Sequence, residues 1–414
     1  MDRKSIEVLN PWWENPEAIK SDSHLQAIAG KHFYFDNPVK ADLVFKKGKT
    51  CILRGARQVG KTTLMKEMIA RTLTEEMVNA KDCLFLTCEN IDSHSELRAT
   101  IVEWMEGRKD RPVLVCLDEI TFVVGWQRAL LWLINSGLLA NATTFISGSN
   151  ARDLKEMGER FPGRKVVESR IYPLSPSDYR ILPVFKGWEK NEILKVYSRV
   201  GGFPHAVRDY CERGEVTDET CETYANWIFG DAYRFKLARE VLLHILFRVY
   251  DTLASQVTWQ RLIEKSPVRS HETAAAYVEH LESAFLCNVL SCYDPDKDMA
   301  APRKAKKIYF IDPLLYQVAG GYLRGIRNVA RWWDGALADA GMRGNLFESI
   351  VASQFAHQFE RTYFWYSSST GQEVDLVIRR GEETMLYEVK SRSQILKPAM
   401  GREVKLITPE SFDF

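Results

Sequence analysis

Short apolar runs alternate with helical patterns over the first half of the chain. Between about residues 36 and 185, four runs of β-branched or apolar residues are separated by stretches with the periodicity of helices. The runs are Cys51 to Leu53, Cys83 to Thr87, Val113 to Leu117 and Thr143 to Ser147. Strands that alternate with helices form parallel sheets that are covered on both faces. The pattern therefore predicts an α/β fold around a buried parallel sheet.

The second half of the chain changes its periodicity. From about 190 to 238 the pattern is helical around the break Gly201-Gly202-Phe203-Pro204, and from 239 to about 312 it predicts three helices and two short strands. The last segment predicts a long helix near Gly344 to Phe359, then a strand, a turn and a second strand. We expect five parts: an N-terminal extension (1–35), an α/β core (36–190), a helical lid (191–238), a helix-and-strand domain (239–320) and a terminal α/β domain (321–414).

Composition narrows the class of protein. The chain has 414 residues, 45% of them apolar and 27% charged, which suits a globular protein of several domains. Its 56 basic and 55 acidic residues leave a formal net charge of +1, so any affinity for nucleic acid must come from a local basic patch. The longest apolar-leaning run, Ala129 to Ile146, contains polar residues, and the first ten residues lack the apolar core of a secretory signal. We therefore expect a cytoplasmic protein without a membrane span.

The cysteines and histidines show no metal-binding spacing. No two cysteines form C-x-x-C, and three of them, Cys51, Cys83 and Cys116, lie within the apolar runs. They are expected to be small buried side chains in a reducing compartment. Any metal ion that the protein uses should therefore have oxygen ligands.

One loop has the pattern of a phosphate-binding loop. The residues Gly55, Ala56, Arg57, Gln58, Val59, Gly60, Lys61, Thr62 and Thr63 fit G-x-x-x-x-G-K-[ST]. They follow the first apolar run and precede a predicted helix, Leu64 to Leu73. In such a loop the backbone N–H groups converge on phosphates, the lysine binds the β and γ phosphates, and the hydroxyl of Thr62 is a ligand for Mg²⁺. The motif predicts ATP and Mg²⁺ as cofactors.

Two acids and a polar pair follow neighbouring strands. Asp118 and Glu119 come directly after five apolar residues, where a buried strand would end. At this edge of a parallel sheet, Asp118 would hold Mg²⁺ through water and Glu119 would polarise the attacking water. The acid pair therefore predicts hydrolysis as well as binding. The next strand ends in Gly148-Ser149-Asn150, where Ser149 or Asn150 could sense the γ-phosphate.

These motifs together resemble archaeal and bacterial AAA+-like P-loop ATPases that carry a C-terminal restriction-endonuclease-like domain. The resemblance includes the loop at 55–63, Asp118-Glu119, Ser149-Asn150, Gly163-Arg164 before Tyr172-Pro-Leu, Gly201-Gly-Phe-Pro204 and Asn10-Pro-Trp-Trp13. It implies that an arginine beyond the sensor strand reaches the nucleotide, sometimes in a neighbouring subunit of a homo-oligomer. Arg164 is the candidate and Arg170 the second choice, while an ordinary surface arginine remains the alternative.

Residues 239–312 resemble a winged helix. The expected helices are Val241 to Ala254, Thr258 to Glu264 and Ser270 to Ala284, and the expected strands are Leu286 to Cys292 and Lys307 to Ile311. The candidate DNA contacts are Arg269 and His271 at the start of the third helix, and Arg303, Lys304, Lys306 and Lys307 as a basic wing tip. The alternative is a packing module, because the third helix also carries three glutamates.

A charged hairpin is predicted near the C-terminus. Its strands, Glu373 to Ile378 and Met385 to Lys390, flank a turn at 379–383. Pairing about the centre of that turn sets Asp375 opposite Glu388 and Glu373 opposite Lys390, with all four side chains on one face. Opposed carboxylates suggest a divalent cation, with Asp375 and Glu388 as ligands and Lys390 near the reacting water.

The hairpin resembles the PD-(D/E)XK nuclease site. The resemblance assigns Asp375, Glu388 and Lys390 to the catalytic set, with Glu348 as the carboxylate from the preceding helix. A solvated charged strand face is the alternative. The preferred hypothesis is an Mg²⁺-dependent ATPase that moves a DNA-associated winged helix and a nuclease-like domain, which would cleave DNA if its site is active. The second hypothesis is a nucleotide-gated switch or scaffold whose terminal domain binds partners without cutting.

Overall fold

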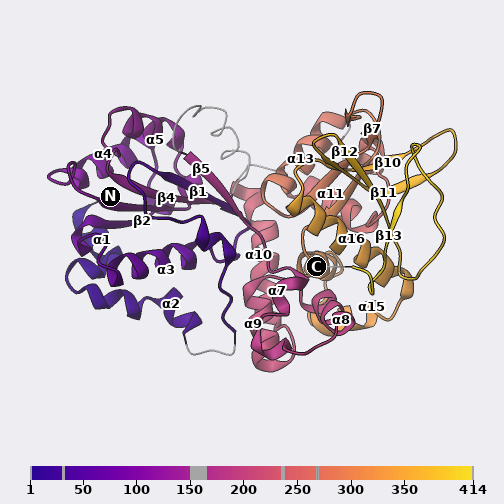
Figure 1. Cartoon of the computed structure of the whole chain (residues 1–414), viewed down its shortest axis with the longest axis horizontal. Helices are drawn as coiled ribbons and strands as arrows, with labels where there is room; N and C mark the ends of the chain where they lie inside the picture. Colours follow the sequence, from indigo (N-terminus) through magenta and orange to yellow (C-terminus); the bar gives the residue numbers. More distant parts are fainter. Residues whose placement is uncertain are drawn as a thin grey trace. The chain divides into compact units, whose positions relative to one another are not determined.

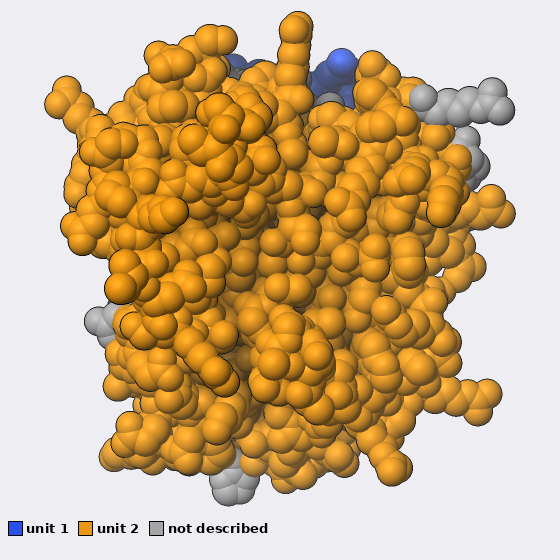
Figure 2. All heavy atoms as spheres, turned by 90° about the vertical axis from the view of Figure 1, so that its right-hand side faces the viewer, with its two compact units in different colours: residues 1–172 blue, residues 173–414 orange. Residues whose placement is uncertain are grey.

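The computed structural model describes residues 2–29, 33–149, 166–234, 238–266, 268 and 270–412. The chain divides into two compact units, residues 1–172 and residues 173–414. Figure 1 traces the elements of both units along the sequence, and Figure 2 colours the first unit blue and the second orange. Among the described residues, no helix combines the length and the apolar character that a membrane span requires.

The first unit is built on a five-stranded parallel sheet with the strand order β2-β3-β4-β1-β5. The strands are β1 (Thr50–Gly55), β2 (Cys83–Thr87), β3 (Val113–Asp118), β4 (Ala142–Gly148) and β5 (Val166–Ile171). The α/β fold with a buried parallel sheet is therefore confirmed. The four predicted runs are the first four strands, whereas β5 was not predicted. Most of its side chains are at least partly exposed, so β5 lacks a long apolar run.

Helices cover both faces of this sheet. In Figure 1, α4 (His94–Met105) and α5 (Trp126–Asn135) lie on one side, and α2 (Ser23–Ile28) and α3 (Lys61–Thr74) lie on the other. The apolar side chains of α4 and α5 pack with those of β2, β3 and β4 in one buried cluster. This three-layer arrangement places the carboxyl ends of the strands at one edge, where the loops that follow them meet.

The N-terminal segment, which includes α1 (Arg3–Leu9), protects the outer edge of β2. The side chain of Asn10 pairs with the backbone of Phe85 through two hydrogen bonds, 2.9 Å to its carbonyl oxygen and 2.6 Å from its N–H. The indole N–H groups of Trp12 and Trp13 both donate to the carbonyl oxygen of Cys83, at 3.1 and 2.7 Å. Unpaired strand edges invite association with other chains, so the Asn-Pro-Trp-Trp motif closes this edge.

The second unit begins with helices packed around a glycine break. These are α7 (Pro176–Tyr179), α8 (Lys190–Val200), α9 (Pro204–Arg213) and α10 (Asp218–Arg234), joined later by α14 (Pro313–Leu323) and α15 (Val329–Ala336). Gly201 has φ 72°, and a Cβ there would lie 2.0 Å from Oδ1 of Asp312. Asp312 caps α14 and accepts hydrogen bonds from the N–H groups of Gly202 (2.7 Å) and Leu314 (2.8 Å). Burial raises the pKa of Asp312 to about 7, although these hydrogen bonds oppose the shift.

The elements expected between 239 and 312 are present. They are α11 (Arg239–Asp251), α12 (Trp259–Ile263), α13 (His271–Ser283) and the antiparallel strands β6 (Cys287–Ser291) and β9 (Lys306–Phe310). Val257 forms an antiparallel bridge with Lys306, which the sequence did not predict. A short hairpin of β7 (Tyr293–Asp294) and β8 (Met299–Ala300) lies between β6 and β9 in the sequence.

The terminal segment carries the long helix α16 (Ala340–Gln358) and a four-stranded sheet with the order β10-β11-β12-β13. Its strands are β10 (Thr362–Tyr366), β11 (Glu373–Arg380), β12 (Glu383–Val389) and β13 (Lys405–Ile407). The hairpin β11–β12 has the predicted register, with Leu376 opposite Tyr387 and Ile378 opposite Met385. The turn is shorter than expected because both strands extend to Arg380 and Glu383. The outer strands β10 and β13 were not predicted.

Candidate functional site

The phosphate-loop motif forms the turn between β1 and α3. Gly60 caps the helix with φ 96°, a left-handed conformation that side-chain-bearing residues rarely adopt, and Gln58 also has a positive φ of 61°. The helix runs for 14 residues from Lys61, so the positive end of its dipole points into the loop. The loop therefore has the geometry of an anion site at a helix N-terminus.

Lys61 is held over this loop by backbone groups. Its ammonium nitrogen lies 3.1 Å from the carbonyl oxygen of Gly55 and 2.8 Å from that of Ala56. It also lies 3.3 Å from Oε1 of Glu119, and only 4% of its side chain is exposed. Two of its three partners are neutral carbonyl groups, so negatively charged phosphate oxygens could replace them and attract the ammonium more strongly.

Asp118 ends β3 and faces the first turn of α3. The hydroxyl of Thr62 donates to Oδ2 of Asp118 at 2.7 Å, and the hydroxyl of Ser147 donates to Oδ1 at 2.5 Å. Burial raises the pKa of Asp118, although both hydroxyls oppose the shift. The structure therefore brings the two expected Mg²⁺ ligands, Thr62 and Asp118, together. Both are hard oxygen donors, which fits Mg²⁺ that takes its remaining ligands from phosphates and water.

Glu119 is fixed beside Lys61 by the end of β4. Its backbone has a positive φ of 50°, and its N–H donates to the hydroxyl of Ser147 at 2.9 Å. The N–H and the hydroxyl of Ser149 donate to Oε2 of Glu119 at 3.2 and 3.0 Å. Burial alone would raise the pKa of Glu119, but Lys61 and Ser149 outweigh it, so the pKa is lowered. Glu119 is therefore a carboxylate at neutral pH, as a residue that orients water must be.

The sheet order explains how these residues meet. Strand β4 lies between β3 and β1, so its last residues stand between the acid pair and the phosphate loop. Sequence reasoning did not identify Ser147, which contacts both acids. Its signal is a hydroxyl near the end of a run of buried residues. Asn150 and Arg164 lie outside the described residues. Arg170 lies in β5, where its guanidinium is 3.5 Å from Glu168.

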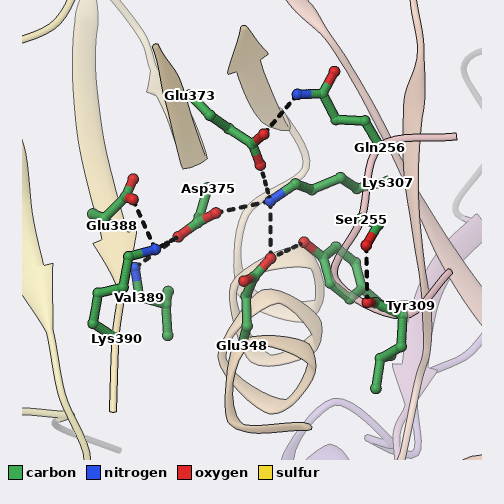
Figure 3. A network of polar contacts seen from close by, with 11 residues as sticks. Ser255, Gln256, Lys307, Tyr309, Glu348, Glu373, Asp375, Glu388, Val389 and Lys390 are labelled. Atoms are coloured by element: carbon green, nitrogen blue, oxygen red, sulfur yellow. Dashed lines mark hydrogen bonds and ion pairs between the residues drawn. The ribbon is translucent and has the colours of Figure 1, made fainter. Parts of the chain in front are cut away.

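The predicted terminal site also assembles, as Figure 3 shows. Asp375 comes from β11, Glu388 from β12 and Glu348 from α16. The ammonium of Lys390 lies 3.3 Å from Oδ2 of Asp375 and 2.8 Å from Oε1 of Glu388. The same oxygen of Asp375 accepts the N–H of Val389 at 3.0 Å. The four residues of the nuclease-like set therefore lie around one point.

Lys307 occupies the centre of that site and corrects our expectation of a basic wing tip. Its side chain is 1% exposed, and its ammonium contacts Glu348 at 2.9 Å, Asp375 at 2.8 Å and Glu373 at 2.5 Å. The neighbouring Lys306 is also buried and donates to the carbonyl oxygens of residues 301, 302 and 304. Neither lysine is available for DNA, because successive residues of β9 point into the protein on opposite faces.

The remaining DNA candidates have mixed outcomes. Arg303 and Lys304 are exposed, as their proposed role requires. His271 is exposed at the start of α13, where its ring nitrogen lies 2.5 Å from Oε1 of Gln260. Arg269 lies outside the described residues.

Glu373 also differs from its expected place. We predicted that it faces Lys390, but its carboxylate pairs with Lys307 and accepts a hydrogen bond from Gln256 at 2.6 Å. The reason is that β12 ends at Val389, so Lys390 leaves the strand and reaches back to Asp375 and Glu388.

The charged groups of the terminal site shift one another's pKa values. Burial raises the pKa of Glu348 to about 7, with Asp375 acting in the same direction and Lys307 against it. Asp375 is buried too, but the two lysines lower its pKa. Burial opposes the charge of Lys307, yet Tyr309 and the surrounding carboxyl groups raise its pKa. Within the described part of the chain, no group of three or more acidic, histidine or cysteine side chains is arranged to hold a metal ion. The ammonium of Lys307 already lies between Glu348 and Asp375, where a divalent cation bound by both would have to sit.

Family comparisons match three stretches of the chain. Residues 47–180 match an AAA domain, residues 191–325 match a domain of unknown function, DUF8612, and residues 343–407 match another domain of unknown function, DUF4143. No curated protein matches the chain. The AAA match, the parallel sheet and the phosphate loop together define an AAA-type P-loop ATPase in the first unit.

Three of the solved structures that match the chain have TM-scores below 0.5. The Walker-type ATPase PABY2304 of Pyrococcus abyssi is 16% identical, with 69% of this chain and 96% of that chain covered and a TM-score of 0.47. The Aeropyrum pernix ORC1 protein, solved in complex with DNA, is 13% identical, with 76% and 97% covered and a TM-score of 0.39. Cdc6p from Pyrobaculum aerophilum is 13% identical, with 75% and 94% covered and a TM-score of 0.30.

Proposed function

We propose that the chain hydrolyses ATP in the presence of Mg²⁺ and uses the nucleotide cycle to act on DNA through its second unit. The observation that carries the proposal is the convergence of Lys61, Thr62, Asp118 and Glu119 at one edge of the parallel sheet. A binding module without catalysis would not require an ionised carboxylate beside the lysine.

Each residue has a definite part in this proposal. Lys61 exchanges its two carbonyl partners for β and γ phosphate oxygens. Thr62 and Asp118 would hold Mg²⁺, which neutralises phosphate charge when it is bound. Glu119 orients and polarises the attacking water, and Ser149 links that carboxylate to the end of β4. Loss of the γ-phosphate would therefore be sensed at Ser149 or Asn150.

The second unit is proposed to contact DNA through a winged helix. Helices α11 to α13, the pair β6–β9 and the bridge between Val257 and Lys306 have the order of such a domain. Arg303 and Lys304 are the exposed cations of its wing, and His271 is exposed at the start of the third helix. Arg269, two residues earlier in the sequence, remains a candidate. An arginine finger, Arg164 or Arg170, would act between subunits of a homo-oligomer. We also infer a cytoplasmic location, because all eight cysteines are free thiols.

The nuclease-like site permits two functions. Asp375, Glu388, Lys390 and Glu348 assemble as a PD-(D/E)XK site would, which supports DNA cleavage. The second candidate function is a nucleotide-gated scaffold whose terminal domain binds partners without cutting. The buried ammonium of Lys307 among the carboxylates favours this second candidate.

The test is ATP hydrolysis by the full chain with Mg²⁺, with and without duplex DNA. Wild-type protein is expected to release phosphate, and Lys61→Ala is expected to lose both nucleotide binding and hydrolysis. Lys66→Ala is the control, because it removes a second buried lysine of α3 that pairs with Asp22 rather than with the loop. Wild-type protein that hydrolyses no ATP, or a fully active Lys61→Ala, would refute the proposal. Labelled DNA incubated with Mg²⁺ or Mn²⁺ then separates cleavage from binding, with Asp375→Ala as the inactive variant.

A further inference from the structure

We propose that Lys307 is a built-in cation that closes the terminal site to divalent metal, so that the site takes up a metal ion only when Lys307 is withdrawn. The inference concerns the carboxylate cluster, which we define as Glu348, Glu373, Asp375 and Glu388. It rests on the nuclease-like site of the proposed function and adds a control over that site.

The first support is the position of the ammonium group. Figure 3 shows Lys307 reaching from β9 to carboxylates that come from α16 and β11. The distances from its ammonium nitrogen to the three carboxylates are 2.5 to 2.9 Å, and only 1% of its side chain is exposed. A divalent cation with oxygen ligands sits about 2.0 to 2.6 Å from each of them, so it would need the space that the ammonium fills.

The second support is that the oxygens facing this point already accept protein donors. Oδ1 of Asp375 accepts from Lys307, and Oδ2 accepts from the N–H of Val389 and from Lys390. Oε1 of Glu348 accepts from Lys307 and also from the hydroxyl of Tyr309 at 2.7 Å. Carboxylates that are committed to donors in this way offer little to a metal ion.

The third support is charge. Two lysines, Lys307 and Lys390, face the four carboxyl groups of the cluster. Removal of Lys307 would leave only Lys390 beside the cluster, and the side chain of Lys390 is 36% exposed. Buried carboxylates without a counter-ion are costly, so the emptied cluster would favour a divalent cation from solution.

The location of Lys307 supplies a way to withdraw it. Strand β9 pairs with β6 and belongs to the helix-and-strand segment for which we propose DNA contact, whereas the carboxylates belong to α16 and the terminal sheet. Lys306 anchors the opposite face of β9 through three backbone carbonyl groups. In this proposal, a shift of β9 that accompanies DNA binding moves Lys307 out of the carboxylate cluster.

The test is a calorimetric titration of the full chain with Mn²⁺ in the absence of nucleotide and DNA. Wild-type protein is expected to bind no Mn²⁺ in this cluster, whereas Lys307→Met should bind one ion with a dissociation constant on the order of 0.1 to 1 mM. Lys306→Met is the matched control, because it removes a buried lysine from the same strand without touching a carboxylate. Adding Asp375→Asn to Lys307→Met should abolish the new binding.

Several results would overturn the inference. These are Asp375-dependent Mn²⁺ binding by wild-type protein, equal binding by Lys306→Met, or no binding by Lys307→Met. Lys307→Gln provides a second, more conservative variant that keeps a polar side chain at the centre. If either variant is unfolded without metal, Mn²⁺ should restore its cooperative unfolding transition, and failure to do so also counts against the inference.

The outcome is separable from that of the proposed function. Metal binding is measured without ATP, so an inactive ATPase leaves the test intact. Asp375-dependent DNA cleavage by wild-type protein that binds no Mn²⁺ before DNA is added would support both the nuclease and the withdrawal of Lys307 on DNA. Binding of Mn²⁺ by Lys307→Met without any cleavage, even with DNA, would support the closing role and reject the nuclease.

Discussion

Two buried lysines, Lys61 in the first unit and Lys307 in the second, lie beside acidic side chains but have different partners. Lys61 rests on two backbone carbonyl groups and lies 3.3 Å from one carboxylate. Lys307 contacts three carboxylates. A carboxylate attracts an ammonium group more strongly than a neutral carbonyl oxygen does, because the charges of the two groups are opposite. Lys61 can therefore release its partners to a ligand, whereas Lys307 is itself the cation that its site requires.

The acids differ in the same way. The carboxylate oxygens of Asp118 accept from the hydroxyls of Thr62 and Ser147, which can rotate toward a metal ion. Those of Asp375 accept from two ammonium groups and from the N–H of Val389, which is fixed by the backbone. The comparison indicates that the first site can exchange its partners for a ligand, whereas the second holds its own cation.

The largest expected effect concerns the first site. Glu119→Gln should lower the rate of ATP hydrolysis by about 10² to 10⁴, because the amide cannot polarise water as a carboxylate does. Nucleotide binding should persist, since Lys61 and the loop are unchanged. Phosphate release and calorimetry with ATP measure the two properties separately. The exposed Glu103→Gln serves as the control. Undiminished hydrolysis by Glu119→Gln would mean that Glu119 does not polarise the attacking water.

Stability should distinguish the two lysines. Lys307→Ala is expected to lower the free energy of unfolding of the second unit by about 3 to 5 kcal/mol, because it leaves buried carboxylates without their counter-ion. Lys61→Ala should cost the first unit less, since it leaves mainly neutral carbonyl groups. Denaturant unfolding of both variants measures the difference. Equal losses of unfolding free energy in the two variants would mean that the carboxylates around Lys307 accept protons or solvent at little cost. That result would contradict the difference that we draw between the two lysines.

Response to pH should separate the units as well. The pKa of Asp312 is raised to about 7 by burial in the second unit, whereas that of Glu119 is lowered in the first. An acid that binds its proton more tightly when folded stabilises the protein at low pH, and the benefit disappears as pH rises toward the folded pKa. The second unit should therefore lose about 2 kcal/mol of stability from this group between about pH 5 and pH 7.

The check is thermal unfolding across this pH range for wild type and Asp312→Asn. The variant should show a flatter dependence on pH, because the titrating group is gone. It should also be less stable at low pH, since one amide oxygen cannot replace the contacts to Gly202 and Leu314. An unchanged pH dependence in Asp312→Asn would assign the effect to another group.

Sequence reasoning succeeded where the signal is contiguous. The phosphate loop and the acid pair follow from short motifs at the ends of apolar strands, and their meeting follows from the parallel sheet. The register of β11 and β12 follows from the turn between them, and Leu376 does pair with Tyr387. In each case the relevant neighbours are close in sequence or set by regular geometry.

The role of Lys307 could not be predicted in this way. Its partners Glu348 and Asp375 lie 41 and 68 residues further along the chain, and no local pattern relates them. Charge density suggested a basic wing tip, because Lys306 and Lys307 follow two other cations. The sequence held one weak sign that both lysines are buried. They begin a run that continues with Ile308, Tyr309 and Phe310, as a buried strand would.

The smallest expected effect concerns the cations that remain exposed beside these buried lysines. Arg303→Ala with Lys304→Ala should weaken binding to duplex DNA by several-fold and reduce the slope of log affinity against log salt by about 2, one for each lost phosphate contact. Lys306→Ala should leave this slope unchanged, because its ammonium is bound to backbone carbonyl groups in the interior. Titration of labelled duplex at several salt concentrations measures both. A lower slope for Lys306→Ala would mean that β9 turns its lysines outward when the protein binds DNA. Lys307 would then also leave the carboxylate cluster, and DNA binding would open that cluster directly.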